Sequence, residues 1–158
     1  MSLKILCSGI LVRYPVGGIS WHHLQYLVGF RQLGHEVTYF EDYGWPRSCY
    51  DLEAHEMTAN PDYGIRYLVT LLRPHGLDGN WCYLAEDGTV HGMSRPELAK
   101  RCRQCDVYVN LSNLNWIEEV QECRRRVLVD TDPVFTQIGA LGMGGAIGGT
   151  PYPVHLWR

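Results

Sequence analysis

The sequence lacks any apolar run long enough to cross a membrane, because Arg, Glu or Asp interrupts each hydrophobic stretch. At its N-terminus one Lys is followed directly by a strand-like run, without the architecture and polar cleavage zone of a secretory signal. We therefore expect a cytoplasmic protein with no membrane span. In that compartment the six cysteines are expected to be reduced thiols.

Lysine is scarce, since the 14 basic residues comprise 12 Arg and two Lys, and the net charge is −3. Residues 51–90 hold seven acidic and two basic side chains, which disfavours a face that follows nucleic-acid phosphates. We therefore expect no nucleic-acid partner. The hydrophobic share of 46% among 158 residues is that of a folded globular domain and argues against disorder of the whole chain.

A strand, a glycine turn, a helix and a second strand follow one another at the start of the chain. Residues 3–10 form an apolar run of strand length, and residues 36–40 are rich in β-branched and aromatic side chains. Between them, Ser20 is a candidate helix N-cap and Gly34 is a natural helix end. The pattern predicts a βαβ unit whose two strands are parallel.

Further elements complete a single sheet. Residues 43–60 are expected to form a loop with at most a short helix. The other predicted elements are a helix over 61–73, a hairpin of strands over 81–84 and 90–93, a helix over 95–104, a strand over 106–111, a short helix over 115–123 and a strand over 127–130. We predict an α/β fold with a doubly wound, mostly parallel, Rossmann-like sheet that carries the hairpin at its edge.

The end of the chain departs from this pattern. Six of the eleven residues from 139 to 149 are glycine, and two prolines follow. Such a segment loses much entropy on ordering and offers few side chains for packing. We therefore predict a Rossmann-like, acceptor-side domain over residues 1–136 and a flexible Gly/Pro-rich tail over residues 137–158.

The candidate binding residues are those that follow the predicted parallel strands. In an open parallel sheet, ligands bind beyond the carboxyl ends of the strands, where the strand order reverses. These residues are Arg13, Tyr14, Gly17, Gly18, Trp21 and His22 after the first strand, Asp42 after the second, Ser112 and Asn113 after the strand at 106–111, and Asp130 and Asp132 at the end of the last strand.

The adjacent glycines Gly17 and Gly18 are the most informative members of this set. Glycine lets the backbone approach a ligand, and the following helix N-terminus presents free N–H groups to an anion such as phosphate. The alternative is that the two glycines form only a tight turn between the strand and the helix and bind no ligand. The G-x-G-x-x-G pattern and the Walker phosphate loop are both absent from the sequence, which disfavours an NAD dehydrogenase and a P-loop nucleotidase.

Two histidines and two aspartates are candidates for acid–base chemistry. A histidine at a helix N-terminus has a lowered pKa and can act as a base near neutral pH. Because neighbours on a helix diverge, only one of His22 and His23 is expected to face the cleft, and a packing or surface role is the alternative for either. Asp42 and Asp132 can bind hydroxyls or orient a base, with capping of a turn as the alternative.

No motif in the sequence predicts a metal site. Cys102 and Cys105 form a C-x-x-C pair, but no second pair at similar spacing completes a zinc site. The pair falls at the end of a predicted helix, where no helix dipole lowers a thiol pKa. Coincidence is therefore favoured over zinc or redox chemistry. The cluster at 130–133 also fits no metal loop.

Three phrases in the first 42 residues carry a resemblance to a known family. They are Lys-Ile-Leu-Cys-Ser-Gly-Ile from residue 4, Tyr-Pro-Val-Gly-Gly-Ile-Ser-Trp from residue 14, and Leu-Gly-His-Glu-Val at residues 33–37. Together they resemble the opening of nucleotide-sugar-dependent glycosyltransferases with the GT-B fold. The likeness is good over residues 4–42 and moderate through the strands at 106–132.

The resemblance implies a two-domain enzyme whose N-terminal domain mainly binds the sugar acceptor and whose C-terminal domain holds most of the nucleotide-sugar. It implies that Gly17 and Gly18 face the donor diphosphate and that His22 or Asp42 contacts the acceptor or serves as the base. It implies no metal and no cofactor, because helix termini and basic side chains meet the phosphates.

The chain ends where the resemblance places the second domain. We therefore expect it to be inactive alone and to require a missing C-terminal domain or a partner chain. An uncovered apolar inter-domain face would favour a homodimer. Two other functions stay open: a stand-alone module that binds a sugar or nucleotide, and a non-catalytic partner subunit.

Overall fold

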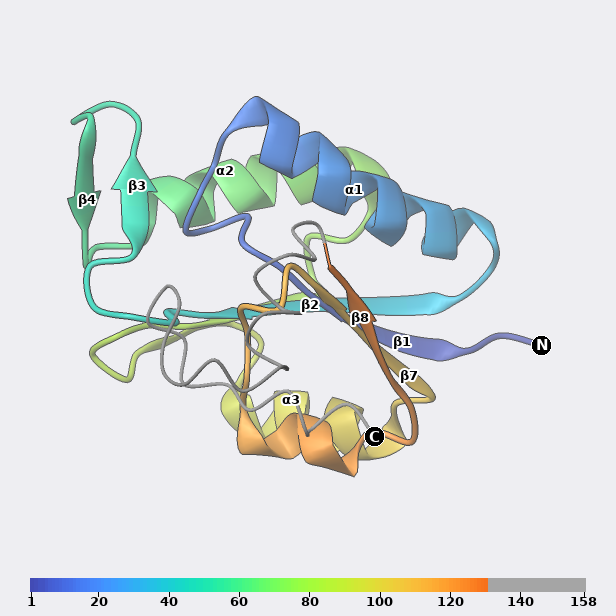
Figure 1. Cartoon of the computed structure of the whole chain (residues 1–158). Coiled ribbons are helices and arrows are strands. Elements are labelled where there is room, and N and C mark those ends of the chain that lie inside the picture. Colours follow the sequence, from blue (N-terminus) through green and yellow to red (C-terminus); the bar gives the residue numbers. More distant parts are fainter. Residues whose placement is uncertain (131–158) are drawn as a thin grey trace.

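The structure, a computed structural model, describes residues 1–130 (Figure 1). The predicted tail, the predicted boundary after residue 136 and Asp132 therefore lie outside the described residues. No helix within the described part of the chain has the length and apolar character needed to span a membrane.

Six strands form one sheet in the order β6-β5-β2-β1-β7-β8. The strands are β1 (Lys4–Ser8), β2 (Glu36–Asp42), β5 (Trp81–Leu84), β6 (Val90–Gly92), β7 (Val107–Leu111) and β8 (Arg126–Val129). All neighbouring pairs are parallel except β5 and β6, which are antiparallel. The predicted α/β class, the mostly parallel sheet and the hairpin at its edge are confirmed.

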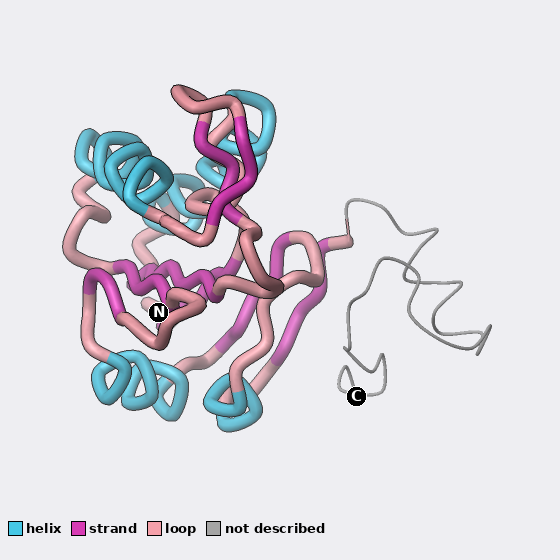
Figure 2. The backbone as a smooth tube through the Cα atoms, turned by 90° about the vertical axis from the view of Figure 1, so that its left-hand side faces the viewer, coloured by secondary structure: helices cyan, strands magenta, loops and turns pink. Residues whose placement is uncertain are grey.

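Helices cover both faces of this sheet, as Figure 2 shows with helical segments above and below the strands. The first face carries α1 (Gly17–Gln32) and α2 (Asp62–Leu72), which continues into the 3-10 turn η1 (Arg73–His75). The second face carries α3 (Arg95–Gln104) and the 3-10 helix η2 (Glu118–Glu122).

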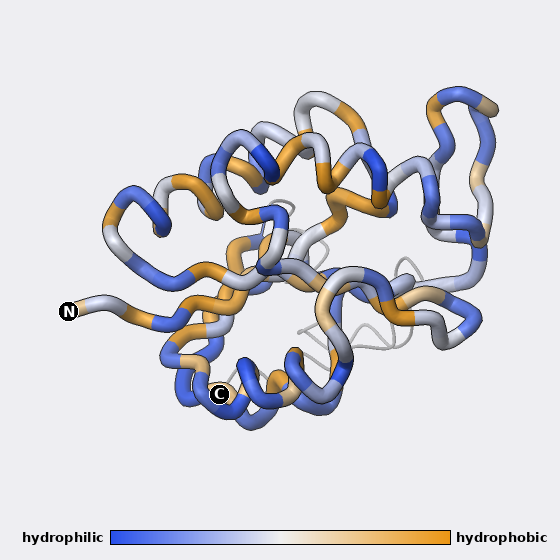
Figure 3. Tube along the Cα trace, turned by 180° about the vertical axis from the view of Figure 1, so that it is seen from behind, coloured by the Kyte–Doolittle hydropathy of each residue, from blue (hydrophilic) through white to orange (hydrophobic). Residues whose placement is uncertain are grey.

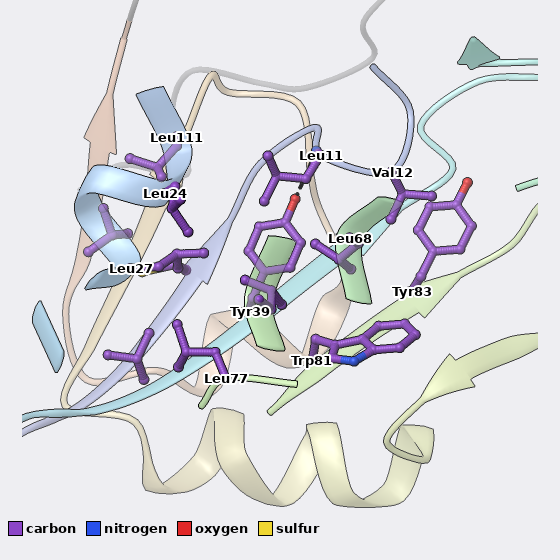
Figure 4. Packing of buried hydrophobic residues seen from close by; sticks show 14 of the residues in the cluster. Leu11, Val12, Leu24, Leu27, Tyr39, Leu68, Leu77, Trp81, Tyr83 and Leu111 are labelled. Carbon is purple, nitrogen blue, oxygen red and sulfur yellow. Dashed lines mark hydrogen bonds between the residues drawn. The ribbon is translucent and has the colours of Figure 1, made fainter. Parts of the chain in front are cut away.

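The strands are apolar on both faces because each face packs against helices. Successive residues of β1 alternate between two cores: Ile5 and Cys7 join the one beneath α1 and α2, and Leu6 joins the one above α3. In the first core, the Tyr39 hydroxyl accepts a hydrogen bond from the Leu11 N–H at 3.1 Å (Figure 4). Figure 3 shows hydrophilic segments on the outer turns of the helices and in the loops that join the elements.

The start of α1 differs from the sequence prediction. The helix begins at Gly17 with Val16 as its N-cap, so Ser20 lies inside the helix instead of capping it. The Ser20 hydroxyl donates to the Val16 carbonyl at 2.9 Å and lies 2.7 Å from the Tyr67 hydroxyl of α2. A serine whose hydroxyl bonds the carbonyl four residues earlier is satisfied inside a helix, which removes the need for a capping position.

Two further predictions were wrong. The segment at residues 43–60 forms an antiparallel hairpin of β3 (Cys49–Asp51) and β4 (Glu56–Thr58) instead of a loop. Its turn is fixed by the Asp51 carboxylate, which accepts the N–H groups of Glu53 and Ala54. The helix expected over 115–123 is only the 3-10 helix η2, preceded by an irregular segment.

Candidate functional site

The strand order reverses between β1 and β7. From β1 the sheet grows through β2 and β5 on one side, and through β7 and β8 on the other. The chain leaves β1 towards α1 on one face and leaves β7 towards η2 on the other (Figure 1). The two connections therefore diverge at the carboxyl ends of the strands, here called the carboxyl edge, where α/β sheets bind ligands.

A buried ion pair lies at this edge. The side chains of Arg13 and Glu41 are both fully buried, and Arg13 Nε lies 3.2 Å from Glu41 Oε1. The Glu41 carboxylate also accepts the backbone N–H groups of Val12 and Arg13, each at 2.8 Å, and the Tyr39 hydroxyl at 2.7 Å. Four donors thus hold one carboxylate, which fixes the loop after β1 against the end of β2.

Asn115 ties the connection after β7 to the same pair. Its Oδ1 accepts the Asp42 N–H at 3.0 Å and Arg13 Nη2 at 3.2 Å, and its Nδ2 donates to the Gly9 carbonyl at 2.7 Å. The Asp42 carboxylate accepts the Trp116 N–H at 2.9 Å. We call Arg13, Glu41, Asp42 and Asn115 the Arg13 network. It joins the ends of three strands.

The network contains two of the predicted site residues. Arg13 and Asp42 were expected to contact a ligand, but their exposed fractions are 0% and 6%. Burial raises the pKa of both Glu41 and Asp42, and the nearby Arg13 guanidinium opposes that shift. Because both side chains are buried and make hydrogen bonds inside the protein, Arg13 and Asp42 hold the edge together, and their burial gives no support to a direct ligand contact.

His23 also belongs to the interior of the site. It is 1% exposed, and its Nδ1 lies 2.8 Å from the Ile19 carbonyl. Its Nε2 lies 3.4 Å from both the Ile10 N–H nitrogen and Ser112 Oγ. His23 therefore joins the loop after β1 to the segment after β7. Burial lowers its pKa to about 4, which makes the ring neutral at pH 7.

His22 is the histidine that reaches the partly exposed flank of α1. Its half-buried ring meets the His23 ring edge-on at 5.2 Å and the Tyr26 ring at 5.5 Å. The structure thus separates the two histidines as the helical divergence predicted. Tyr14 is half-buried, and Trp21 is 67% exposed.

Gly17 and Gly18 form the exposed first turn of α1. A Cβ added to either glycine would meet nothing within 4 Å, so no close contact inside the protein requires them. Their predicted contact with a donor diphosphate stays a prediction. No acidic side chain stands in the first turn of α1, so its N–H groups face no carboxylate from that turn.

The segment after β7 is strained. Ser112 has φ of 101° and Asn113 has φ of 58°, both in a region that residues with a Cβ rarely adopt. Such strain persists only where surrounding contacts impose it, and it clusters at functional sites. Both side chains are half-buried, as is Asp130 after β8.

Several buried polar atoms without a hydrogen-bond partner belong to the segments that follow β1 and β7 or to the end of β7. Among the described residues they include Arg13 Nη1, His22 Nε2, Asn110 Oδ1 and Asn113 Oδ1. Most buried polar atoms in folded proteins are paired, so a group of unpaired ones indicates a further polar partner. Donor and acceptor atoms are both present, which suits a ligand with hydroxyl groups.

Sequence reasoning missed Glu41 and Asn115, two of the four residues in the Arg13 network. Glu41 was read as the end of a strand and Asn115 as the start of a helix. A charged residue at the end of an otherwise apolar strand was the available signal for Glu41, and Asn115 gave none. Among residues 1–130, no group of three His, Cys, Asp or Glu side chains is arranged to hold a metal ion.

Comparisons with known proteins add no identity to this geometry. No protein-family model, curated protein or solved structure matches the chain. The functional conclusion therefore depends on the carboxyl edge itself and on the resemblance of residues 4–42.

Proposed function

We propose that this chain forms the acceptor side of a glycosyltransferase that transfers a sugar from a nucleotide-sugar, with a second α/β domain or a partner chain holding most of the donor. We assign its sheet to the doubly wound, Rossmann-like class, in keeping with helices on both faces and a reversed strand order. The observation that carries the proposal is the group of unpaired polar atoms at the point of reversal.

The acceptor would bind between the start of α1 and the segment after β7. His22 Nε2, Ser112 Oγ and Asn113 Oδ1 can each hydrogen-bond a sugar hydroxyl. The Arg13 network holds both connections in place before any ligand arrives, which reduces the entropy that binding must overcome. The Arg13 network therefore positions the two connections, and the partly exposed side chains contact the sugar acceptor.

Transfer requires a base for the acceptor hydroxyl. In the proposed reaction His22 Nε2 takes the hydroxyl proton, the acceptor oxygen forms a bond to the anomeric carbon, and the nucleoside diphosphate leaves with the electrons of the broken bond. The N–H groups at Gly17 and Gly18 would stabilise the departing diphosphate. No metal or cofactor is included. Asp42, the other base predicted from the sequence, is not included because it is buried in the Arg13 network.

Replacing His22 is expected to weaken sugar binding. Titration calorimetry of the chain with mono- and disaccharides should give weak affinities that fall at least about tenfold in His22→Ala, the equivalent of one lost hydrogen bond to a buried group. The matched control is His91→Ala on the edge strand β6, which should bind like the unmodified chain.

The same titration tests the assignment of this chain to the acceptor side. UDP-, GDP- and dTDP-sugars should bind weakly or undetectably, because most donor contacts belong to the other domain. Sub-micromolar affinity for any of them would contradict the assignment. If the coding sequence after Arg158 continues into a second α/β domain, the longer chain should transfer sugar and its His22→Ala variant should not.

One observation favours the alternative of a stand-alone sugar-binding module. The Arg13 network holds the loops at the carboxyl edge together through hydrogen bonds between residues within 1–130. A stand-alone module should be monomeric by light scattering and should keep its sugar affinity when a second domain is added. A half-enzyme should self-associate and gain transfer activity with that domain.

A further inference from the structure

Strand β8 forms one edge of the six-stranded sheet. It pairs with β7 on its inner side, and no strand within residues 1–130 pairs with its outer side. The Val129 carbonyl accepts the Ser112 N–H at 3.1 Å, so the backbone groups of Val129 face inward. Neighbouring residues of a strand direct their backbone groups to opposite sides. Leu128 therefore presents its N–H and its carbonyl on the outer side of β8.

This edge lacks the features that protect an edge strand from pairing. Such strands are usually very short, carry charges or proline, or are interrupted. The opposite edge strand, β6, has three residues and ends at Gly92, whose φ of 79° departs from extended backbone. The centre of β8 is the uncharged run Val127, Leu128 and Val129, and the Val127 side chain is 43% exposed. Of the two edges, β8 is the one suited to pairing with another strand.

The charges around β8 select the partner and its direction. Arg124, Arg125 and Arg126 precede the apolar centre, and Asp130 follows it. Arg124 lies 3.7 Å from the Asp106 carboxylate of its own chain, which leaves the charges nearest to the centre to define the ends of the strand. A strand that is basic at one end and acidic at the other is complementary to a copy of itself that runs in the opposite direction.

We propose that two copies of this chain pair antiparallel through β8, with Leu128 of each copy opposite Leu128 of the other. The two leucines exchange both of their outward backbone hydrogen bonds across a twofold axis. Arg126 of each copy then stands opposite Asp130 of the other, and Val127 stands opposite Val129. The two sheets become one continuous sheet.

The register of this pairing follows from the same groups. A shift of one residue would set Leu128 opposite a residue whose backbone groups face β7. A shift of two would set Leu128 opposite Arg126 or Asp130 and would separate the opposite charges. Arg126 Nη1 donates to the Gln121 carbonyl at 3.3 Å, and the guanidinium has further N–H donors for a carboxylate of the second copy.

The dimer is expected to be reversible. Because β8 has only four residues, the contact is smaller than that of a permanent dimer, and we expect a dissociation constant of about 1–100 μM. The pairing does not involve His22, Ser112 or Asn113 and therefore does not depend on what the carboxyl edge binds. A variant that blocks β8 separates this dimer from the self-association expected of a half-enzyme.

The first test replaces Leu128 with proline in the full chain. Leu128→Pro removes the outward N–H and keeps the hydrogen bonds to β7, a position where edge strands tolerate proline. Sedimentation velocity, over concentrations that span the expected dissociation constant, should show a monomer–dimer equilibrium for the unmodified chain. Dimerisation should be at least about tenfold weaker in Leu128→Pro, which loses both central hydrogen bonds.

The matched control is Val90→Pro on the opposite edge strand. Val90 is 37% exposed, close to the value for Val127. The Ala85 N–H donates to the Thr89 carbonyl at 2.9 Å, so the next residue, Val90, directs its own N–H away from β5. Val90→Pro should dimerise like the unmodified chain.

A charge exchange tests the partner and the register without proline. Arg126→Glu and Asp130→Arg each set like charges opposite one another at both ends of the dimer, so each variant alone should dimerise at least about tenfold more weakly. An equimolar mixture of the two variants restores opposite charges at both ends and should form a mixed dimer.

Three results would overturn the proposal. They are a monomeric unmodified chain at every concentration, unchanged dimerisation in Leu128→Pro, and no recovery in the mixture of charge variants. If the chain's own residues after 130 cover β8, the chain should stay monomeric and the Leu128 amide should be protected from hydrogen exchange at every concentration. In the proposed dimer, that protection should instead increase with protein concentration.

Discussion

Arg13→Met is expected to lower the free energy of unfolding by about 3–5 kcal/mol, one of the two largest effects predicted for this chain. The variant leaves the Glu41 carboxylate buried, with its N–H and hydroxyl donors but without the guanidinium. It also removes one of the two hydrogen bonds that Asn115 Oδ1 accepts. Urea denaturation followed by circular dichroism measures the change.

Two comparisons make this prediction specific to a buried pair. Arg95→Met breaks the ion pair with Glu119 at 2.9 Å, in which the arginine side chain is 57% exposed, and should change stability by about 1 kcal/mol or less. The double variant Arg13→Met/Glu41→Leu removes both charges and should recover part of the lost stability. If Arg13→Met and Arg95→Met have equal effects, Arg13 does not hold the carboxyl edge together.

Acidification should destabilise the unmodified chain more than His23→Gln. Burial lowers the pKa of His23 from 6.5 to about 4, so between these pH values the unfolded chain binds more protons than the folded one. Stability therefore falls as the pH decreases through this window, by about 3 kcal/mol from this residue. His23→Gln lacks the titrating ring and should escape this loss.

The effect must be measured as a difference between the two proteins. Burial raises the pKa of Glu41 and Asp42. A carboxyl group with a raised pKa in the folded state lowers the free energy of unfolding as the pH increases, which is opposite to the pH dependence expected from His23. Those contributions are present in both proteins and cancel. Unfolding free energies from urea denaturation at several pH values between 4 and 7 give the comparison. Parallel curves would show that His23 is not buried as a neutral ring.

The fold was predictable because local patterns determine most of its elements. The apolar run in β1 reflects burial on both faces, and Gly34, with φ of 84°, ends α1 where a residue without Cβ is favoured. Ser94 caps α3 through the Glu97 N–H, at the start of the helix predicted over residues 95–104. The hairpin of β3 and β4 was missed because strands of three residues leave almost no periodic signal.

The sequence was sufficient to select a candidate site, but it did not indicate the contacts that the selected residues make. Strand ends and the reversal rule select the carboxyl edge. The sequence does not show that Arg13 meets Glu41 and Asn115, which lie 28 and 102 positions away. Burial of Arg13 and Asp42 depends on those distant contacts. His23, a neighbour of the predicted His22, is buried for the same reason.

Sugar binding at the carboxyl edge is the central property proposed for this chain. Nuclear magnetic resonance of the ¹⁵N-labelled chain, titrated with mono- and disaccharides, maps that contact residue by residue. The account predicts that the amide signals of Gly17, Gly18, Ser112 and Asn113 shift together with one dissociation constant, and that they stay unchanged in His22→Ala. Shifts confined to the opposite edge of the sheet, around Lys4 and Arg101, or no saturable shift at Ser112 and Asn113, would contradict it.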